Sequence, residues 1–260
     1  MELTYGRYLR IDELLDQQRQ QSEGPEHDEL LFIIIHQVYE LWFKQSLHEL
    51  DQFVRHLDAD DVPRAGHTLK RVLKIFKTLV TQLDVLETMT PLEFQSFRDF
   101  LASGSGFQSA QFREVEFALG QKDPSHLERF VDNEREYANL TARFESPTIW
   151  DTVLRLLDRN GRSIPADVLG RDFTQPVTPN EEVQAVLIEM YRTDPYMAGL
   201  CEALTDLDEG LQEWRYRHVM MVQRTIGTKM GTGGSSGADY LRSTLFRPAF
   251  PDLWAIRTSF

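Results

Sequence analysis

DELLFIIIHQVYELWFKQSLHELDQFVRHL, residues 28–57, is the stretch that decides the fold. It contains neither Gly nor Pro, and after Ile35 its apolar residues recur every three or four positions, which is the period of an amphipathic helix. The run LLFIII at 30–35 is apolar all round, so we expect it to be buried on every side. The stretch therefore predicts one long core helix.

Two further stretches repeat this spacing. Residues 62–89 carry apolar side chains at helical intervals, and residues 194–226 begin with Asp194 and with Pro195 at the first helical position, a favoured helix start. Shorter helical segments are predicted at 5–15, 91–102, 108–119, 124–143, 147–159 and 179–191. No segment alternates apolar and polar residues as a half-buried strand would, so the predicted fold class is all-α.

The connections between these segments are loops of ordinary length, and no change in composition is large enough to mark a domain boundary. We therefore expect a single helical domain over residues 1–260. Residues 1–20 form its N-terminal arm, residues 160–180 a surface excursion and residues 227–237 a glycine-rich loop.

Composition limits the possible partners. Forty-one acidic residues against 28 basic ones give a formal charge of −13, which would repel the phosphate backbone of a nucleic acid. No stretch approaches 18 uncharged apolar residues, and the N-terminus lacks the basic region and apolar run of a signal peptide. We expect a soluble, cytoplasmic chain with neither membrane nor nucleic acid as partner. The one cysteine, Cys201, excludes an internal disulfide and a cysteine-cluster metal site.

Two of the seven histidines stand in otherwise apolar runs: His36 in FIIIHQVY and His218 in YRHVMMV. The other five have charged neighbours and are expected on the solvated surface. A buried imidazole needs partners for its nitrogens, and the plainest interpretation of either residue is a core histidine bonded to a backbone carbonyl.

The helix face of His218 carries no further metal ligand, but apolar residues and one threonine: Leu211, Trp214, Met221, Val222 and Thr225. One imidazole on such a face suits a cofactor that brings its own equatorial ligands, as haem does. Plain core packing is the alternative interpretation of the same pattern.

Two pairs of residues indicate a binding pocket. Phe32 and His36 are four residues apart and share one helix face, which places an aromatic ring beside an imidazole and suits a flat substrate with one polar edge. Phe94 and Arg98 repeat the spacing, with a guanidinium fork that matches a carboxylate. A surface ion pair is the more ordinary interpretation of Arg98.

The run GTKMGTGGSSG at 227–237 resembles a ligand-binding loop, but its residue order excludes the two common nucleotide motifs. Lys229 precedes the glycine cluster, whereas a phosphate loop has Lys after its last glycine. A dinucleotide fingerprint starting at Gly231 would need a third glycine at the position of Ser236. A flexible linker is the alternative interpretation.

Four segments, in order along nearly the whole chain, resemble the tryptophan 2,3-dioxygenase family of haem enzymes. They are LTYGRYL (3–9), HDELLFIIIHQVYELWFKQ (27–45), SGSGFQSAQFRE (103–114) and WRYRHVMMVQRTIGTKMGTGGSSGADYLRSTL (214–245). The resemblance implies an enzyme that uses ferrous haem b and O2 to cleave the indole C2–C3 bond of L-tryptophan. The product would be N-formyl-L-kynurenine, in the first step of tryptophan catabolism by the kynurenine pathway.

The resemblance also assigns roles to residues. His218 matches the axial ligand of the haem iron, with Ser105 and Trp214 beside the cofactor, and His36 matches the catalytic histidine that faces the indole nitrogen. Arg98 matches the partner of the substrate carboxylate, and Thr232, on the loop at 227–237, a hydroxyl that fixes the amino-acid backbone. The remaining matches surround the substrate: Phe32, Ile33, Ile34, Ile35 and Phe94, the last standing where some members carry Tyr.

Tyr5 and Tyr8 match residues that reach across from a neighbouring subunit, which implies a homotetramer. The glycines at 227–237 would let that loop order over the substrate when it binds. Three other functions remain open at this point: a haem sensor without turnover, a related haem protein acting on another indole, and a structural helical interaction protein.

Overall fold

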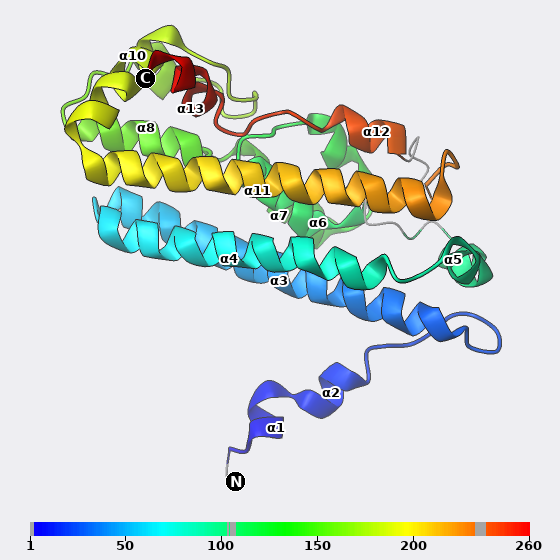
Figure 1. Cartoon of the computed structure of the whole chain (residues 1–260). Helices are drawn as coiled ribbons and strands as arrows, with labels where there is room; N and C mark the ends of the chain where they lie inside the picture. Colours follow the sequence, from blue (N-terminus) through cyan, green and yellow to red (C-terminus); the bar gives the residue numbers. More distant parts are fainter. Residues whose placement is uncertain (1–2, 103, 105–107, 232–237) are drawn as a thin grey trace.

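A computed structural model describes residues 3–102, 104, 108–231 and 238–260 (Figure 1). Within these ranges all regular elements are helical, as the sequence predicts. Three long helices lie side by side: α3 (His27–Asp58), α4 (Val62–Leu86) and α11 (Pro195–Ile226). Helix α4 packs against both of the others. The three predicted long helices are confirmed, and α4 ends three residues before the predicted boundary at Met89.

Local capping fixes where two of these helices begin. The side chain of Asp194 accepts a hydrogen bond from the backbone N–H of Met197, and Pro195 occupies the first turn of α11. Asp61 accepts from the N–H of Arg64 at the start of α4. Both caps satisfy donors that a helix N-terminus leaves unpaired.

The remaining helices, including the short 3₁₀ segments η1, η3 and η4, cover one side and both ends of the long ones (Figure 1). They are α5 (Pro91–Arg98), η1 (Asp99–Leu101), α6 (Ala110–Ala118), η3 (Pro124–Phe130), α7 (Glu134–Glu145), α8 (Ile149–Arg159), α9 (Ala166–Leu169), α10 (Glu181–Thr193), α12 (Ala238–Ser243), α13 (Pro251–Ala255) and η4 (Ile256–Ser259). The prediction of one helix at 124–143 is wrong, because the segment forms two elements, η3 and α7. Asn133 has an extended backbone and caps α7 with its side chain, which starts a new helix there.

The N-terminal arm projects away from the bundle (Figure 1). It forms α1 (Tyr5–Leu9) and α2 (Ile11–Leu15) rather than the single helix predicted at 5–15, because Arg10 between them adopts a left-handed backbone with φ of 52°. Where the arm joins the bundle, the carboxylate of Glu29 on α3 accepts hydrogen bonds from the backbone N–H groups of Gln21 and Ser22 and from the Ser22 hydroxyl. These bonds fix the direction in which the arm leaves α3.

The main apolar core draws its residues from α3, α4, α8, α10, α11 and α13, among other elements. The expectation that LLFIII is buried on every side is wrong for the single chain. Ile35 is 6% exposed, whereas Leu30 and Ile34 are 41% and 40% exposed, because only one side of α3 packs against the bundle at this end. No helix among the described residues is long and apolar enough to cross a membrane.

The segment between α12 and α13 runs along α11 and is held there through its main chain. Asp208 accepts from the N–H groups of Ala249 and Phe250. Gln212 accepts from the N–H of Phe246 and donates to the carbonyl of Arg247. The chain from α12 to α13 is therefore fixed beside the helix that carries His218.

Candidate active site

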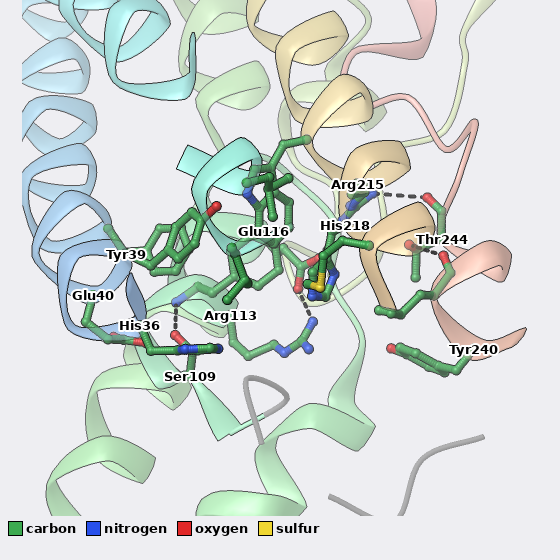
Figure 2. Close-up of a pocket in the computed structure, with 17 residues that line it drawn as sticks. His36, Tyr39, Glu40, Ser109, Arg113, Glu116, Arg215, His218, Tyr240 and Thr244 are labelled. Atoms are coloured by element: carbon green, nitrogen blue, oxygen red, sulfur yellow. Dashed lines mark hydrogen bonds and ion pairs between the residues drawn. The ribbon is translucent and has the colours of Figure 1, made fainter. Parts of the chain in front are cut away.

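One cavity joins the two histidines that the sequence singles out. It lies between α3, α4, α6, α11 and α12, encloses about 830 Å³ including the part open to solvent, and is lined by both His36 and His218 (Figure 2). The wall is mainly aromatic and aliphatic: Tyr39, Phe43, Leu83, Leu86, Phe112, Trp214, Met221 and Leu241.

A second cavity of about 600 Å³ adjoins the first and shares His36, Glu40 and Ser109 with it. Its other lining residues are Phe32, Leu101, Gly104 and Gln108. The turn at its mouth is closed by a 2.7 Å hydrogen bond from Gly104 N–H to the carbonyl of Leu101. A Cβ on Gly104 would stand 2.9 Å from that carbonyl oxygen, so this turn requires glycine.

The imidazole of His36 has a defined proton position. Its Nδ1 lies 2.7 Å from the carbonyl oxygen of Phe32, and because a carbonyl can only accept, Nδ1 carries the proton. In the neutral ring Nε2 is then left as an acceptor. Burial lowers the pKa of His36, against the opposing effects of the Phe32 carbonyl and the charge of Glu40. The Phe32 ring lies beside the imidazole, with 4.1 Å between centroids.

His218 lies on α11 with its ring stacked on Trp214, 5.2 Å between centroids and 9° between planes. Burial, with smaller contributions from the charges of His36 and Arg113, lowers the pKa of His218 to about 4. The imidazole is therefore neutral at neutral pH. The imidazole of His218 makes no hydrogen bond to the described residues, so the lone pair of one ring nitrogen is available for a ligand.

A buried ionic cluster that was not predicted from the sequence forms one wall of the cavity. Arg113 and Glu116 lie one turn apart on α6, and Arg215 comes from α11; each is 5% exposed. Both guanidiniums donate to the Glu116 carboxylate (Figure 2), and Arg215 also donates to the carbonyl of Thr244. Burial alone would raise the pKa of Glu116, but the two guanidiniums outweigh it and hold the pKa below the ordinary value. These three side chains bring two guanidiniums and one carboxylate to the cavity wall.

One histidine lies elsewhere than expected. His126, predicted on the solvated surface, is 6% exposed, because η3 packs its imidazole toward the Phe117 ring of α6. Burial, followed by the charge of Arg113, lowers the pKa of His126. The charged residues beside His126 in the sequence are typical of a surface segment and do not indicate that its imidazole is buried.

The structure brings only some of the other predicted residues to the cavities. Phe94 packs on Phe32, 5.9 Å between centroids, while Arg98 donates a 2.6 Å hydrogen bond to the carbonyl of Met230. Ile33, Ile34 and Ile35 are not among the lining residues of either cavity. Consecutive residues of a helix point in different directions, so only Phe32 and His36 of this run reach the cavities.

Four predicted residues cannot be placed in a site within this single chain. Tyr5 and Tyr8, on the arm, are 77% and 71% exposed. Ser105 and Thr232 lie outside the described residues. Their roles, like that of the loop at 227–237, stay predictions.

Comparison with known proteins identifies the family. The profile of the tryptophan 2,3-dioxygenase family matches residues 1–152 and 184–260. The chain belongs to this family. The tryptophan 2,3-dioxygenase of Herpetosiphon aurantiacus is 58% identical over 255 residues, which cover 98% of this chain and 97% of that protein.

Other tryptophan 2,3-dioxygenases are similar over the same length. That of Anaeromyxobacter dehalogenans is 55% identical over 98% of this chain and 95% of its own, and that of Caulobacter vibrioides 45% identical over 99% and 98%. All the site residues named above fall within the two ranges matched by the tryptophan 2,3-dioxygenase profile. The unmatched residues, 153–183, include the predicted surface excursion at 160–180 and α9.

Proposed function

We propose that this chain is a haem-dependent tryptophan 2,3-dioxygenase, which cleaves the indole C2–C3 bond of L-tryptophan with O2 to give N-formyl-L-kynurenine. Membership of the family gives the reaction class. The observation that carries the proposal is the single cavity with a neutral imidazole from α3 on one side and another from α11 on the other. In this arrangement His218 would hold the cofactor and His36 would face the substrate.

The residues of the cavity fit haem. His218 is partly exposed and neutral, and its imidazole makes no hydrogen bond to the described residues, so a ring nitrogen is available to the iron. Trp214, Phe43 and Phe112 offer an apolar surface to a flat macrocycle. The guanidiniums of Arg113 and Arg215 line the cavity and suit the carboxylates of haem, since a guanidinium presents several donors that match carboxylate oxygens.

When bound, ferrous haem b would supply the activation of O2, and the protein would supply placement and a dry pocket. His36 Nε2, left as an acceptor by the bond from Nδ1 to Phe32, would accept the hydrogen bond of the indole N–H. His36 orients the ring through this hydrogen bond and does not need to act as a base, because attack of the indole on oxygen does not require prior loss of the N–H proton. Phe32 and Phe94 would pack against the indole.

The amino-acid part of the substrate would be fixed at separate points. Arg98 would pair with the carboxylate, because a guanidinium fork matches two carboxylate oxygens, and Thr232 would contact the backbone of the substrate. Selection for L-tryptophan follows from holding the ring and the carboxylate at once.

We also propose a homotetramer in which Tyr5 and Tyr8 close the site of a neighbouring subunit. The support is the arm itself, none of whose residues in α1 or α2 is buried in the single chain. A second surface also lacks a cover within the chain, namely the exposed side of α3 at Leu30 and Ile34. A neighbouring copy would shield both surfaces from water.

The deciding experiment is incubation of the reduced, haem-loaded protein with L-tryptophan and O2, followed by mass spectrometry of the product. We expect N-formyl-L-kynurenine, with a mass 32 Da above that of tryptophan, as addition of two oxygen atoms requires. Bound haem without any product would instead indicate a sensor. A product of another mass would indicate a different indole chemistry.

A further inference from the structure

Helix α5 contacts both α3, which carries His36, and α11, which carries His218. Its start is fixed by a capping box, in which Thr90 and Glu93 exchange side-chain to backbone hydrogen bonds, and by Pro91 in the first turn. Phe97 is fully buried and its ring lies 5.6 Å from that of Phe32 on α3. The helix also packs against α11, at the end of the bundle where α11 terminates (Figure 1).

Two side chains on one face of α5 hold the segment that follows α11. Arg98 Nη2 donates to the carbonyl of Met230 at 2.6 Å. One turn earlier, the amide oxygen of Gln95 accepts a longer bond of 3.4 Å from Lys229 Nζ. Lys229 and Met230 are consecutive in the chain, so α5 holds this segment through two neighbouring hydrogen bonds.

Within the described part of the chain, the bond to Met230 uses one of the Arg98 donors and leaves the others available. A guanidinium has five N–H groups in a planar fork, and the Met230 carbonyl takes one of them. The others can meet a carboxylate at the same time, because donors on the same fork point in different directions. Arg98 can therefore serve two acceptors at once, one in the protein and one in a ligand.

We propose that Arg98 is a positioning residue as well as a carboxylate-binding one: it anchors residues 229–230 to α5, and so couples recognition of the substrate carboxylate to the position of these two residues. The coupling rests on the proposed function, whereas the anchor itself needs no substrate. A ligand carboxylate orders the same guanidinium that holds the segment, so each contact favours the other.

Limited trypsin digestion of the haem-loaded, substrate-free protein tests the anchor, because Lys229–Met230 is itself a trypsin site. Cleavage of a protected bond follows the population of the locally opened segment, and a hydrogen bond from a charged donor contributes enough for at least about a tenfold change in that population. We expect Arg98→Gln to raise the cleavage rate at Lys229 about tenfold or more, relative to cleavage after Arg10 on the exposed arm. An unchanged rate would overturn the proposal.

A conservative variant separates anchoring from carboxylate recognition. Arg98→Lys keeps a donor for the Met230 carbonyl but loses the fork, so its cleavage rate at Lys229 is expected to stay within about threefold of wild type while KM for L-tryptophan rises. If Arg98→Lys is cleaved as fast as Arg98→Gln, Lys does not restore the anchor and the role we assign to the hydrogen bond is wrong. Arg64→Gln, an exposed ion-pair arginine at the start of α4, is the matched control and leaves the rate unchanged.

Ligands then test the coupling. L-tryptophan is expected to slow cleavage at Lys229 in the wild type, and tryptamine, which lacks the carboxylate, to leave it unchanged. Equal protection by L-tryptophan in wild type and Arg98→Gln would refute the coupling. Absence of N-formyl-L-kynurenine in the separate product assay would instead refute the proposed function, and the substrate-free comparison would still stand.

Discussion

Trp214 and His218 stack one helical turn apart on α11, with their ring planes 9° from parallel. The indole ring thus holds the imidazole by face-to-face contact rather than by a hydrogen bond. This arrangement fixes the plane of His218 while leaving its nitrogens available.

Removal of the Trp214 ring is expected to disturb both stability and cofactor binding. The side chain is 9% exposed and packs on Phe112 as well as on His218, so Trp214→Ala should cost about 3–5 kcal/mol in the free energy of unfolding. Urea denaturation of the haem-free protein measures this loss, and a haem titration measures the effect on binding. Trp214→Phe keeps a ring in place and is expected to retain most of both; equal losses in the two variants would show that stacking is not what matters.

His218→Ala is expected to abolish haem binding and activity together, because the variant lacks the only nitrogen that we assign to the iron. The absorbance of the haem band and the haem content per chain measure this, and circular dichroism checks that the helices persist. His67→Ala, at an exposed position of α4, is the control. Unchanged haem content in His218→Ala would refute the ligand assignment.

The lowered pKa of His218 predicts how the haem-free protein responds to acid. The folded-state pKa of about 4 lies below the ordinary value of 6.5, so between these pH values the unfolded chain binds more protons than the folded one. The free energy of unfolding therefore falls as pH decreases from 6.5 to 4, by at most about 3 kcal/mol from this group. Urea denaturation at a series of pH values should show a shallower slope for His218→Phe, which cannot titrate.

Loss of the Glu116 carboxylate should destabilise the fold. Glu116→Gln removes the carboxylate to which the buried guanidiniums of Arg113 and Arg215 both donate, and breaking a buried ion pair in this way costs about 3–5 kcal/mol. Glu213→Gln removes the partner of Lys77 in an exposed pair and is expected to cost less than about 1 kcal/mol. Urea denaturation measures both losses in the free energy of unfolding. Similar losses in the two variants would show that the buried ion pairs stabilise the fold no more than an exposed pair does.

Deletion of residues 1–16 should separate folding from assembly. None of the side chains of α1 and α2 is buried in the chain, and the bonds from Gln21 and Ser22 to Glu29 remain. We expect the helical content to persist while the mass in solution, measured by light scattering, falls below that of a tetramer and KM for L-tryptophan rises. A truncated tetramer with wild-type KM would contradict the role proposed for Tyr5 and Tyr8.

The helices of this fold are largely predictable from the sequence because their apolar periodicity is unbroken over many turns. The errors arise where a single backbone conformation matters, as at Arg10, which breaks the leading helix, and Asn133, which starts α7. The exposure of Ile34 was not predictable for a different reason: periodicity shows that a run is apolar but not what covers it.

The two histidines of the site were predictable because each interrupts an apolar run. The cluster of Arg113, Glu116 and Arg215 was not, because α6 and α11 are about a hundred residues apart in the chain and meet only in the fold. A signal was present in the segment AQFREVEFAL, where Arg113 and Glu116 stand one turn apart among apolar residues. Charges at such positions are seldom buried unless they are paired. The sequence does not indicate the third member, because Arg215 lies 99 residues from Glu116.

The segment from Thr244 to Phe250 also bears on how this protein can change. Its hydrogen bonds to Asp208, Gln212 and Arg215 all involve its main chain, and the side chain of Phe246 is 89% exposed. Mutations at 247 are therefore expected to accumulate without loosening the segment. Position 246 is more restricted, because its backbone has a left-handed φ of 58° that β-branched residues and proline do not readily adopt. A single change at Asp208 would release two backbone donors at once, so side-chain variation is tolerated better at 247 than at Asp208.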